Sequence, residues 1–298
     1  MKKITLLLLS ILLSMSIAGC SSFWEKDNNT VVIGGKNFTE QDILVYMMKG
    51  IIEEKTDIKV KAKAYLGGTN VVSQAIDRGD LDIYAEYTGT ALVSVLDEEY
   101  SPSDPEVVYE KVKTIYDAKK QIIWLKPFGF NNTYTLSMRT EQANALGIET
   151  FSDLAKQSAA LRLGATHEFL ERIDGYKNVK AVYNMKFSSP AGMDPGLTYT
   201  ACRDSNVDVI DAFSTDGRIL AFNLKVLADD KKVFPPFYAA PIIRADTLKK
   251  HPEIGEALNL LAGKLTNEEM MTLNAKVDLE GKSPQVVANE WLKAKGLI

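Results

Sequence analysis

Aromatic residues at four junctions between a predicted strand and a turn are the side chains best suited to chemistry in this sequence. They are Tyr87 before Thr88-Gly89-Thr90, Tyr134 after Asn131-Asn132-Thr133, Phe213 before Ser214-Thr215-Asp216-Gly217, and Phe237 after Pro235-Pro236. Rings that surround one volume attract a cation through their quadrupoles, by about 0.5–2 kcal/mol per good contact. A quaternary ammonium group suits such a cage because it is weakly hydrated. The alternative is that these are four ordinary aromatics among the 11 Phe, 12 Tyr and 3 Trp of the chain.

The stretch Asp80–Thr90 indicates how one of these rings is placed. Apolar and polar residues alternate with the period of a strand, and the stretch ends in a turn at Gly89, where backbone can come close to another group. Ligands of open α/β sheets bind at the carboxyl ends of strands, so Tyr87 is predicted to form one wall of a ligand site. Alternatively, Tyr87 covers a core and exposes its hydroxyl. The acids Asp82 and Glu86 share the polar face of the alternation, which is expected to be solvated.

Catalysis has little support in the sequence. The chain has two histidines, and it contains no HExxH, GxSxG, GxGxxG or Walker A pattern. His251 stands beside Lys250 and Pro252 and is expected at the surface, whereas His167 is the one base available to a serine nucleophile. Cys202 has no partner for a disulfide and is predicted to be a small buried residue. We therefore expect no enzyme, metal or cofactor, and keep an exported enzyme that uses His167 as an alternative.

The first 19 residues have the features of a lipoprotein signal peptide. Two lysines precede the apolar stretch Ile4–Ile17, and Ile17-Ala18-Gly19-Cys20 resembles the bacterial lipobox. Cys20 is thus expected to carry lipid, and residues 20–29 to form a tether. An ordinary signal peptide with a chance cysteine is the alternative. No later run of about 18 apolar residues exists, so we do not expect an integral permease.

The mature chain is predicted to be a mixed α/β protein. Strands at 31–33, 58–65 and 80–87 alternate with a helix that Thr39 is expected to cap and a helix opened by Thr69, which predicts a parallel sheet with right-handed crossovers. A second set of strands and helices follows, and the chain then returns to the first. The net charge of −4 and the absence of long basic runs argue against a nucleic-acid partner.

Two crossings are predicted between the two sets of elements, near 126–131 and 224–230. The length of 298 residues allows two domains of about 100–150 residues. Lobe I is expected to comprise 30–127 and 229–298, and lobe II to comprise 128–228. Two similar lobes with two crossings suggest a hinged clamshell that closes on a ligand.

Seven short motifs extend this interpretation, in order along essentially the whole mature chain. They are GKNFTEQ (35–41), LGGTN (66–70), YTGT (87–90), GFNNTY (129–134), DGYK (174–177), STDGR (214–218) and FPPF (234–237). Together they resemble the substrate-binding lipoproteins of osmoprotectant ABC importers, the glycine betaine/carnitine/choline-binding proteins of the OpuC/OpuB/ProX type.

The resemblance implies a two-lobed class II periplasmic-binding-protein fold with an aromatic cage for trimethylammonium. It also implies delivery of the ligand to a membrane permease driven by a separate ATPase. The protein is then expected to be exported and lipid-anchored at the outer face of the cell membrane, or periplasmic, with a monomeric binding domain.

By the same resemblance, the cage positions fall on Tyr87, Tyr134, Phe213 and Phe237. The family more often has Tyr at the last two positions, so phenylalanine keeps the ring face and loses the hydroxyl. Tyr238 is adjacent to the fourth position and is an alternative for that wall.

The resemblance also implies that the positions holding the polar end of the ligand fall on Lys36, Thr90 and Asn132. Relatives often have Gln at the first position. An ammonium group there favours betaine-like zwitterions over choline, unless Lys36 points to solvent or pairs with an acid such as Glu40. An amino acid or other small zwitterion is the alternative ligand. An Arg and an Asp converging on it would indicate this, yet Arg172, Arg203 and Arg218 lie at no obvious strand-end turn.

Overall fold

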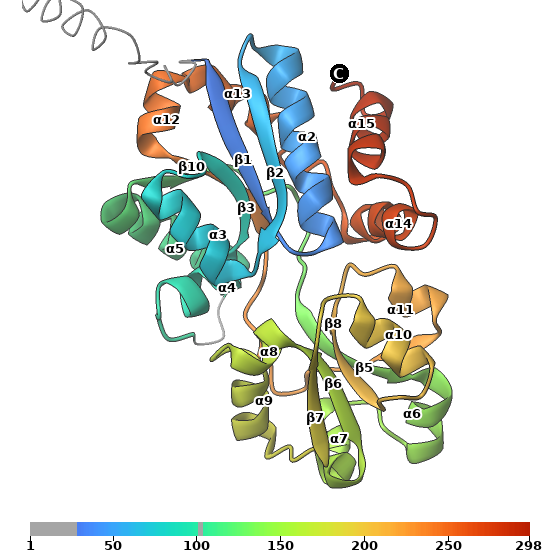
Figure 1. The fold of residues 1–298 in the computed structure, drawn as a ribbon. Helices are drawn as coiled ribbons and strands as arrows, with labels where there is room; N and C mark the ends of the chain where they lie inside the picture. Colours follow the sequence, from blue (N-terminus) through green and yellow to red (C-terminus); the bar gives the residue numbers. More distant parts are fainter. Residues whose placement is uncertain (1–28, 101–103) are drawn as a thin grey trace, which may run out of the picture. The chain divides into compact units, whose positions relative to one another are not determined.

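The computed structural model describes residues 29–100 and 104–298. The predicted signal peptide, Cys20 and nearly all of the tether lie outside the described residues. Val31–Ile298 form one compact unit that contains two sheets of five strands each (Figure 1). Within the described ranges, no helix is both long and apolar enough to cross a membrane.

The first sheet has the strand order β2-β1-β3-β10-β4. Its strands are β1 (Thr30–Lys36), β2 (Lys59–Gly67), β3 (Ile83–Tyr87), β4 (Ile122–Trp124) and β10 (Ala239–Arg244). The parallel pairing predicted from the strands at 31–33, 58–65 and 80–87 is found between β1 and β3, whereas β10 runs antiparallel to both β3 and β4. The complete sheet is mixed, because β10 enters from the far end of the chain and not through a strand–helix–strand crossover.

Helices cover both faces of the first sheet. Residues of α2, α13, α14 and α15 pack on one face, and residues of α3 and α5 on the other. The helices of this part are α2 (Thr39–Lys55), α3 (Thr69–Arg78), α4 (Thr88–Thr90), the π-helix Ala91–Val95, α5 (Pro105–Lys120), α12 (Ala245–Lys250), α13 (Pro252–Asn259), α14 (Asn267–Asp278) and α15 (Pro284–Ala294). This two-sided cover excludes water from both faces of β3.

The second sheet has the order β7-β6-β8-β5-β9, and β5 runs antiparallel to its neighbours β8 and β9. Its strands are β5 (Tyr134–Arg139), β6 (Arg162–Thr166), β7 (Ser189–Met193), β8 (Val209–Phe213) and β9 (Leu224–Val226). Its helices are α6 (Thr140–Leu146), α7 (Phe151–Gln157), the 3₁₀ turn Ser158–Ala160, α8 (His167–Glu171), α9 (Tyr176–Tyr183), α10 (Leu197–Arg203) and α11 (Arg218–Ala221). A separate apolar cluster under α10 and α11 contains the free, buried Cys202, as predicted.

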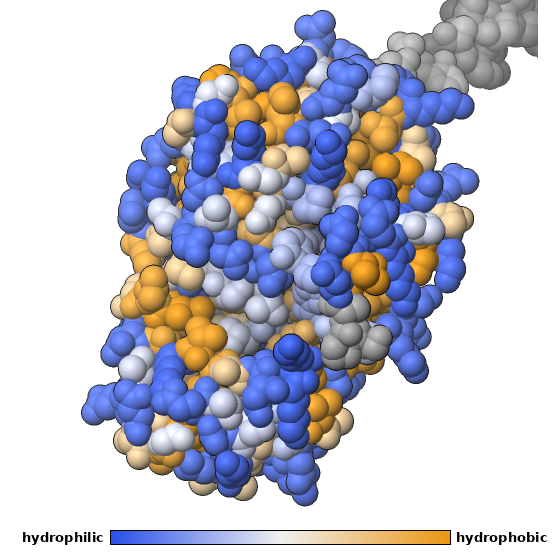
Figure 2. Space-filling view, turned by 180° about the vertical axis from the view of Figure 1, so that it is seen from behind, coloured by the Kyte–Doolittle hydropathy of each residue, from blue (hydrophilic) through white to orange (hydrophobic). Residues whose placement is uncertain are grey.

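Two segments connect the sheets, 125–133 from β4 to β5 and 227–238 from β9 to β10. They pair with each other through the isolated bridge between Asn131 and Tyr238. The predicted lobe limits, between 127 and 128 and between 228 and 229, fall within these two segments. Figure 2 shows one face of this unit, on which hydrophobic residues form separate areas among hydrophilic ones.

Three local predictions are wrong for physical reasons. Asp82 and Glu86 are buried, 7% and 0% exposed, because α3 and α5 cover the face that alternation assigned to solvent. His251 is 9% exposed at the junction of α12 and α13, not a solvated surface residue. Thr39 does not cap α2: Phe38 is the N-cap, and the Thr39 hydroxyl donates to Asp278 Oδ1 at 2.5 Å.

Asp42, in the first turn of α2, gives a pH-dependent stability prediction. Burial raises the pKa of Asp42 to about 6, and the nearby charge of Asp278 adds to the shift, although the Tyr65 amide donates to Asp42 Oδ1 at 2.9 Å. In the unfolded chain the pKa of this carboxyl group is about 3.9. Above pH 6 Asp42 is ionised in both states, and because ionisation is harder in the folded state, the charge lowers the free energy of unfolding. Asp42→Asn should then raise the free energy of unfolding at pH 7.5 by about 1 kcal/mol, after discounting for partial exposure.

Urea unfolding at two pH values checks this. Most of the gain should disappear at pH 4, because the carboxyl group is then protonated in the folded state and only about half ionised in the unfolded state. Asp117→Asn, at an exposed position of α5, is the matched control and should change little at either pH. An equal gain at pH 4 and pH 7.5 is incompatible with this explanation.

Candidate functional site

The seven residues predicted to bind ligand line one cavity, to which both sheets contribute. They are Lys36, Tyr87, Thr90, Asn132, Tyr134, Phe213 and Phe237. Tyr87 and Lys36 end strands of the first sheet, Phe213 ends β8 and Tyr134 begins β5. Phe237 lies in the segment that returns to the first sheet and lines the cavity, whereas the adjacent Tyr238 does not.

Aromatic rings form one wall of this cavity. The Tyr134 ring lies 4.9 Å from the Phe213 ring and 5.8 Å from the Phe237 ring, centroid to centroid, and the latter contact is edge-on. Phe38, which the sequence analysis missed, stacks at 5.3 Å on Phe213 and at 6.2 Å on Tyr87. It thereby joins the rings of the two sheets. Phe38 follows β1 just before a helix, so the same strand-to-turn rule could have identified it.

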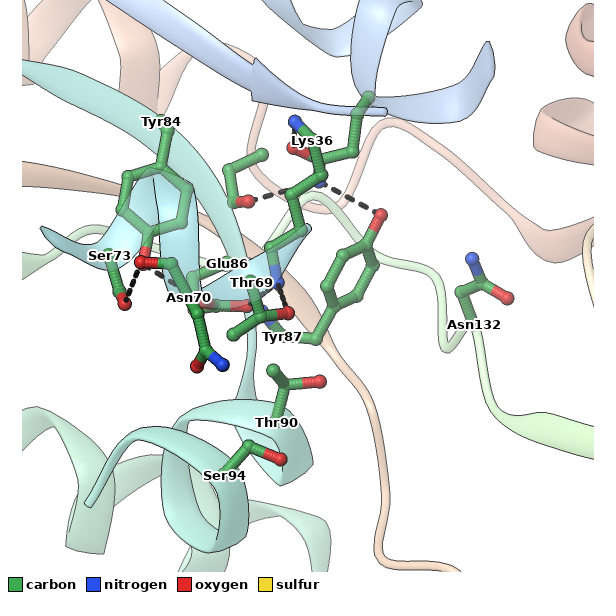
Figure 3. A network of polar contacts seen from close by, with 12 residues as sticks. Lys36, Thr69, Asn70, Ser73, Tyr84, Glu86, Tyr87, Thr90, Ser94 and Asn132 are labelled. Carbon is green, nitrogen blue, oxygen red and sulfur yellow. Dashed lines mark hydrogen bonds and ion pairs between the residues drawn. The ribbon is translucent and has the colours of Figure 1, made fainter. Parts of the chain in front are cut away.

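Lys36 is 2% exposed and ion-paired within the first sheet (Figure 3). Its Nζ donates to Glu86 Oε1 at 2.6 Å and to Thr69 Oγ1 at 3.1 Å, and lies 5.2 Å from the centre of the Tyr87 ring. Glu86 also accepts from the Tyr84 hydroxyl at 2.9 Å. Lys36 therefore pairs with an acid, although this acid is Glu86 and not Glu40. Its charge is balanced, and the predicted repulsion of choline by a free ammonium group does not follow.

Arg172 also lines the cavity, with its guanidinium over the Tyr134 ring, and the sequence analysis did not predict it there. Its guanidinium carbon is 5.5 Å from the centre of the Tyr134 ring, and Nη2 donates to Thr90 Oγ1 at 3.2 Å. Asp174 and Glu168 accept from the same guanidinium at 2.5 and 3.2 Å. Arg172 directly follows α8, a short helix that starts at the carboxyl end of β6, and this position could have suggested a role at the cleft.

Glu168 connects this guanidinium to the first sheet. Thr69 Oγ1 donates to Glu168 Oε1 at 2.5 Å. Burial alone would raise the pKa of Glu168, yet Lys36 and Arg172 hold it below its usual value. Further along the same edge, Ser94 Oγ donates to Asp174 Oδ1 at 3.1 Å. Together with a hydrogen bond from the Thr69 amide to Glu168 Oε1 at 3.4 Å, four hydrogen bonds thus join α3, α4 and the π-helix to α8 and the residues that follow it.

A second cavity shares Phe38 and Phe213 with the first, and Glu40 lines it. Asn132 borders both cavities, and its Nδ2 donates to Glu40 Oε1 at 2.8 Å.

His167 lines the first cavity. The described residues contain no cluster of three or more His, Cys, Asp or Glu side chains placed to hold a metal. The arrangement suits a small ligand with a cationic apolar end and a polar end.

Comparisons with known proteins support this interpretation. A family model described as "OpuAC: Substrate binding domain of ABC-type glycine betaine transport system" matches residues 29–294. The chain is 39% identical to the carnitine transport binding protein OpuCC of Listeria monocytogenes, over 98% of this chain and 97% of that protein. It is 38% identical to the ergothioneine transport permease/ergothioneine binding protein EgtU of Helicobacter pylori strain G27, over 93% of this chain and 50% of that protein.

One solved structure is also similar along nearly the whole chain. It is described as a glycine betaine/carnitine/choline ABC transporter, and it aligns with a TM-score of 0.74 at 36% sequence identity. The alignment covers 90% of this chain and 99% of the other. The two-sheet architecture found here is therefore shared with a protein of related sequence.

Proposed function

Since the chain belongs to the family of substrate-binding domains of ABC-type glycine betaine transport systems, we propose that its cavity binds a quaternary ammonium compatible solute for import. The predicted fold class, a two-lobed class II periplasmic-binding-protein fold, is confirmed by the solved structure of similar sequence. The observation that carries the ligand proposal is the convergence of aromatic rings from both sheets on one cavity that also holds Arg172 and Thr90.

The rings receive the trimethylammonium group. Five rings present their faces or edges to the cavity: Tyr87, Phe38, Phe213, Tyr134 and Phe237. Such contacts are worth about 0.5–2 kcal/mol each and need no hydrogen bond from the ligand. Phenylalanine at 213 and 237 serves this purpose as well as tyrosine, because the attraction comes from the ring.

The polar end of the ligand faces Arg172 and Thr90. A planar guanidinium recognises a carboxylate well, and Thr90 adds a hydroxyl that already contacts Arg172 Nη2. Both cations already pair with acids, Lys36 with Glu86 and Arg172 with Glu168 and Asp174. Arg172 contributes more, because its guanidinium has five N–H groups and gives only four of them to Asp174, Glu168 and Thr90. We therefore expect betaine-like zwitterions, such as glycine betaine and carnitine, to bind more tightly than choline.

Ligand binding is coupled to closure of the lobes. We propose lobe I at 30–127 and 229–298 and lobe II at 128–228, with hinges near 126–131 and 224–230. Three pairs of residues form hydrogen bonds that hold the lobes together around the cavity: Thr69 with Glu168, Thr90 with Arg172, and Ser94 with Asp174. A ligand that touches both lobes binds the closed state better and shifts the equilibrium toward it.

The remaining parts of the proposal concern the cellular setting. The closed form delivers its ligand to a membrane permease that a separate ATPase drives. The protein is exported and anchored at the outer face of the cell membrane by lipid on Cys20, or it is periplasmic. The binding domain acts as a monomer and not as an enzyme.

A ligand panel tests the proposal. Thermal unfolding of the mature chain is followed with glycine betaine, carnitine, ergothioneine, choline, proline and glutamine. At a hundredfold excess over the dissociation constant, a ligand stabilises by about 2.7 kcal/mol, which raises Tm by several degrees. We expect this shift with the trimethylammonium zwitterions and a smaller one with choline. Stabilisation by proline or glutamine alone would overturn the proposal in favour of the amino-acid alternative.

A further inference from the structure

Among the described residues, the buried acid that is hydrogen-bonded to the ring wall has no basic partner. Glu40 lies in the first turn of α2 and is 2% exposed. Its Oε1 accepts from the Tyr87 hydroxyl at 2.7 Å and from Asn132 Nδ2 at 2.8 Å, and its Oε2 accepts from Thr215 Oγ1 at 2.6 Å. Asn274 Nδ2 is a further donor at 3.4 Å. None of these donors carries a charge.

Three acids near the first cavity differ from Glu40 in this respect, whereas Asp211, which lines the second cavity and accepts from Thr166, shares it among the described residues. Glu86 pairs with Lys36 at 2.6 Å, and Asp174 and Glu168 pair with Arg172 at 2.5 and 3.2 Å. Within the described part of the chain, no Lys or Arg forms an ion pair or hydrogen bond with Glu40. A buried carboxylate that lacks a counter-charge is costly, and burial raises the pKa of Glu40 although four groups donate to it.

We propose that Glu40 is the buried counter-charge for the ammonium group of the ligand and determines specificity for cationic over neutral head groups without touching the ligand. This inference rests on the proposed function, because it requires a cation in the ring cage. The positive charge that Glu40 lacks is then supplied by the ligand itself.

The route from Glu40 to the ligand is short. Tyr87 lines the cavity with its ring and donates its hydroxyl proton to Glu40, so the carboxylate lies one hydrogen bond beyond the cage. A phenol that donates to an anion becomes more electron-rich, which strengthens attraction of a cation to its ring face. Glu40 and Tyr87 are 2% and 4% exposed, so the direct Coulomb attraction between the two charges is weakly screened.

A structural role is the competing explanation for the same contacts. Thr215 lies in the loop after β8 of the second sheet, and Glu40 lies in α2 beside the first sheet. The hydrogen bond from Thr215 to Glu40 therefore also connects the two lobes. A tie of this kind strengthens binding of any ligand that needs the closed state. It does not distinguish a cation from a neutral group of the same shape.

Two ligands of one shape separate these explanations. Glycine betaine and 3,3-dimethylbutanoate differ only in that a quaternary carbon replaces the quaternary nitrogen. Their dissociation constants are measured by calorimetry on the mature wild-type chain and on Glu40→Gln. We expect the preference for betaine over its neutral-head isostere to fall about tenfold in Glu40→Gln, from loss of one weakly screened charge.

The glutamine side chain fits the existing site. Asn132 Oδ1 and Asn274 Oδ1 are both buried without a partner in the structure, so either amide can rotate and accept from the new NH₂ group. Thr215→Val is the matched control, because it removes one donor and keeps the charge. It should weaken both ligands by a similar factor and leave their ratio unchanged.

The possible results separate this inference from the proposed function. A wild-type protein that binds betaine no better than the isostere overturns both. A wild-type protein that prefers betaine, together with a folded Glu40→Gln variant that keeps the full preference, overturns the inference alone. If Glu40→Gln does not fold, Tyr87→Phe removes the hydroxyl link. The betaine preference should fall in this variant too, and an unchanged ratio overturns the inference.

Discussion

Replacing Tyr134 by alanine is expected to weaken binding of glycine betaine at least a hundredfold and to lower the free energy of unfolding by about 3–5 kcal/mol. Tyr134 is 6% exposed and contacts four other rings, with centroid distances of 4.9–5.9 Å. Removing it takes away one ring of the cage and the support of Phe213 and Phe237. It also removes the surface on which the Arg172 guanidinium lies. Calorimetric titration and urea unfolding measure the two effects.

Two further variants separate binding from stability. Tyr134→Phe keeps the ring and should bind betaine within about threefold of the wild type, because the cation is attracted by the ring face. Tyr183→Ala removes another buried tyrosine, which packs on Phe151 and lines neither of the two cavities described above. It should lower stability and leave affinity nearly unchanged. Betaine affinity within tenfold of the wild type in a folded Tyr134→Ala variant would exclude Tyr134 from the cage.

Local chemistry explains which parts of the fold could be predicted from the sequence. The helix opened by Thr69 ends at Gly79, whose φ of +78° suits glycine. Thr266 and Glu269 form a capping box at the start of α14, and Ser283 caps α15 before Pro284. Each of these signals depends on neighbouring residues only. The antiparallel entry of β10 between β3 and β4 depends on a strand that lies more than a hundred residues later, so no local pattern indicates it.

The candidate site shows the same limit. All seven predicted residues reach one cavity, since six lie at a strand end or in a connection between the sheets and Thr90 lies in the short helix α4 directly after β3. The partners of those residues could not be predicted. Alternation assigned Glu86 to one face of a strand, but only tertiary packing decides that α3 and α5 bury this face and that Glu86 meets Lys36. Arg172 was missed because its position depends on where the short helix α8 ends.

The Lys36–Glu86 pair leads to the second large effect. Lys36→Met is expected to lower the free energy of unfolding by about 3–5 kcal/mol, because it leaves Glu86 charged in an interior without a basic partner. Both side chains are almost completely buried, 3% and 0% exposed. Glu86 would keep the Tyr84 hydroxyl and the Tyr87 amide, at 2.9 and 2.7 Å, but neither supplies a positive charge. Urea unfolding at pH 7.5 measures the loss.

A double-mutant cycle assigns this loss to charge and not to packing. Glu86→Gln alone should cost less than Lys36→Met, because Lys36 keeps Thr69 and the nearby negative charge of Glu168. The double variant Lys36→Met/Glu86→Gln should recover most of the stability lost in Lys36→Met, since no uncompensated charge remains and glutamine still accepts from Tyr84. Purely additive losses would mean that Lys36 stabilises through its aliphatic chain. Near-recovery would establish that Lys36 and Glu86 stabilise the fold by neutralising each other's charge.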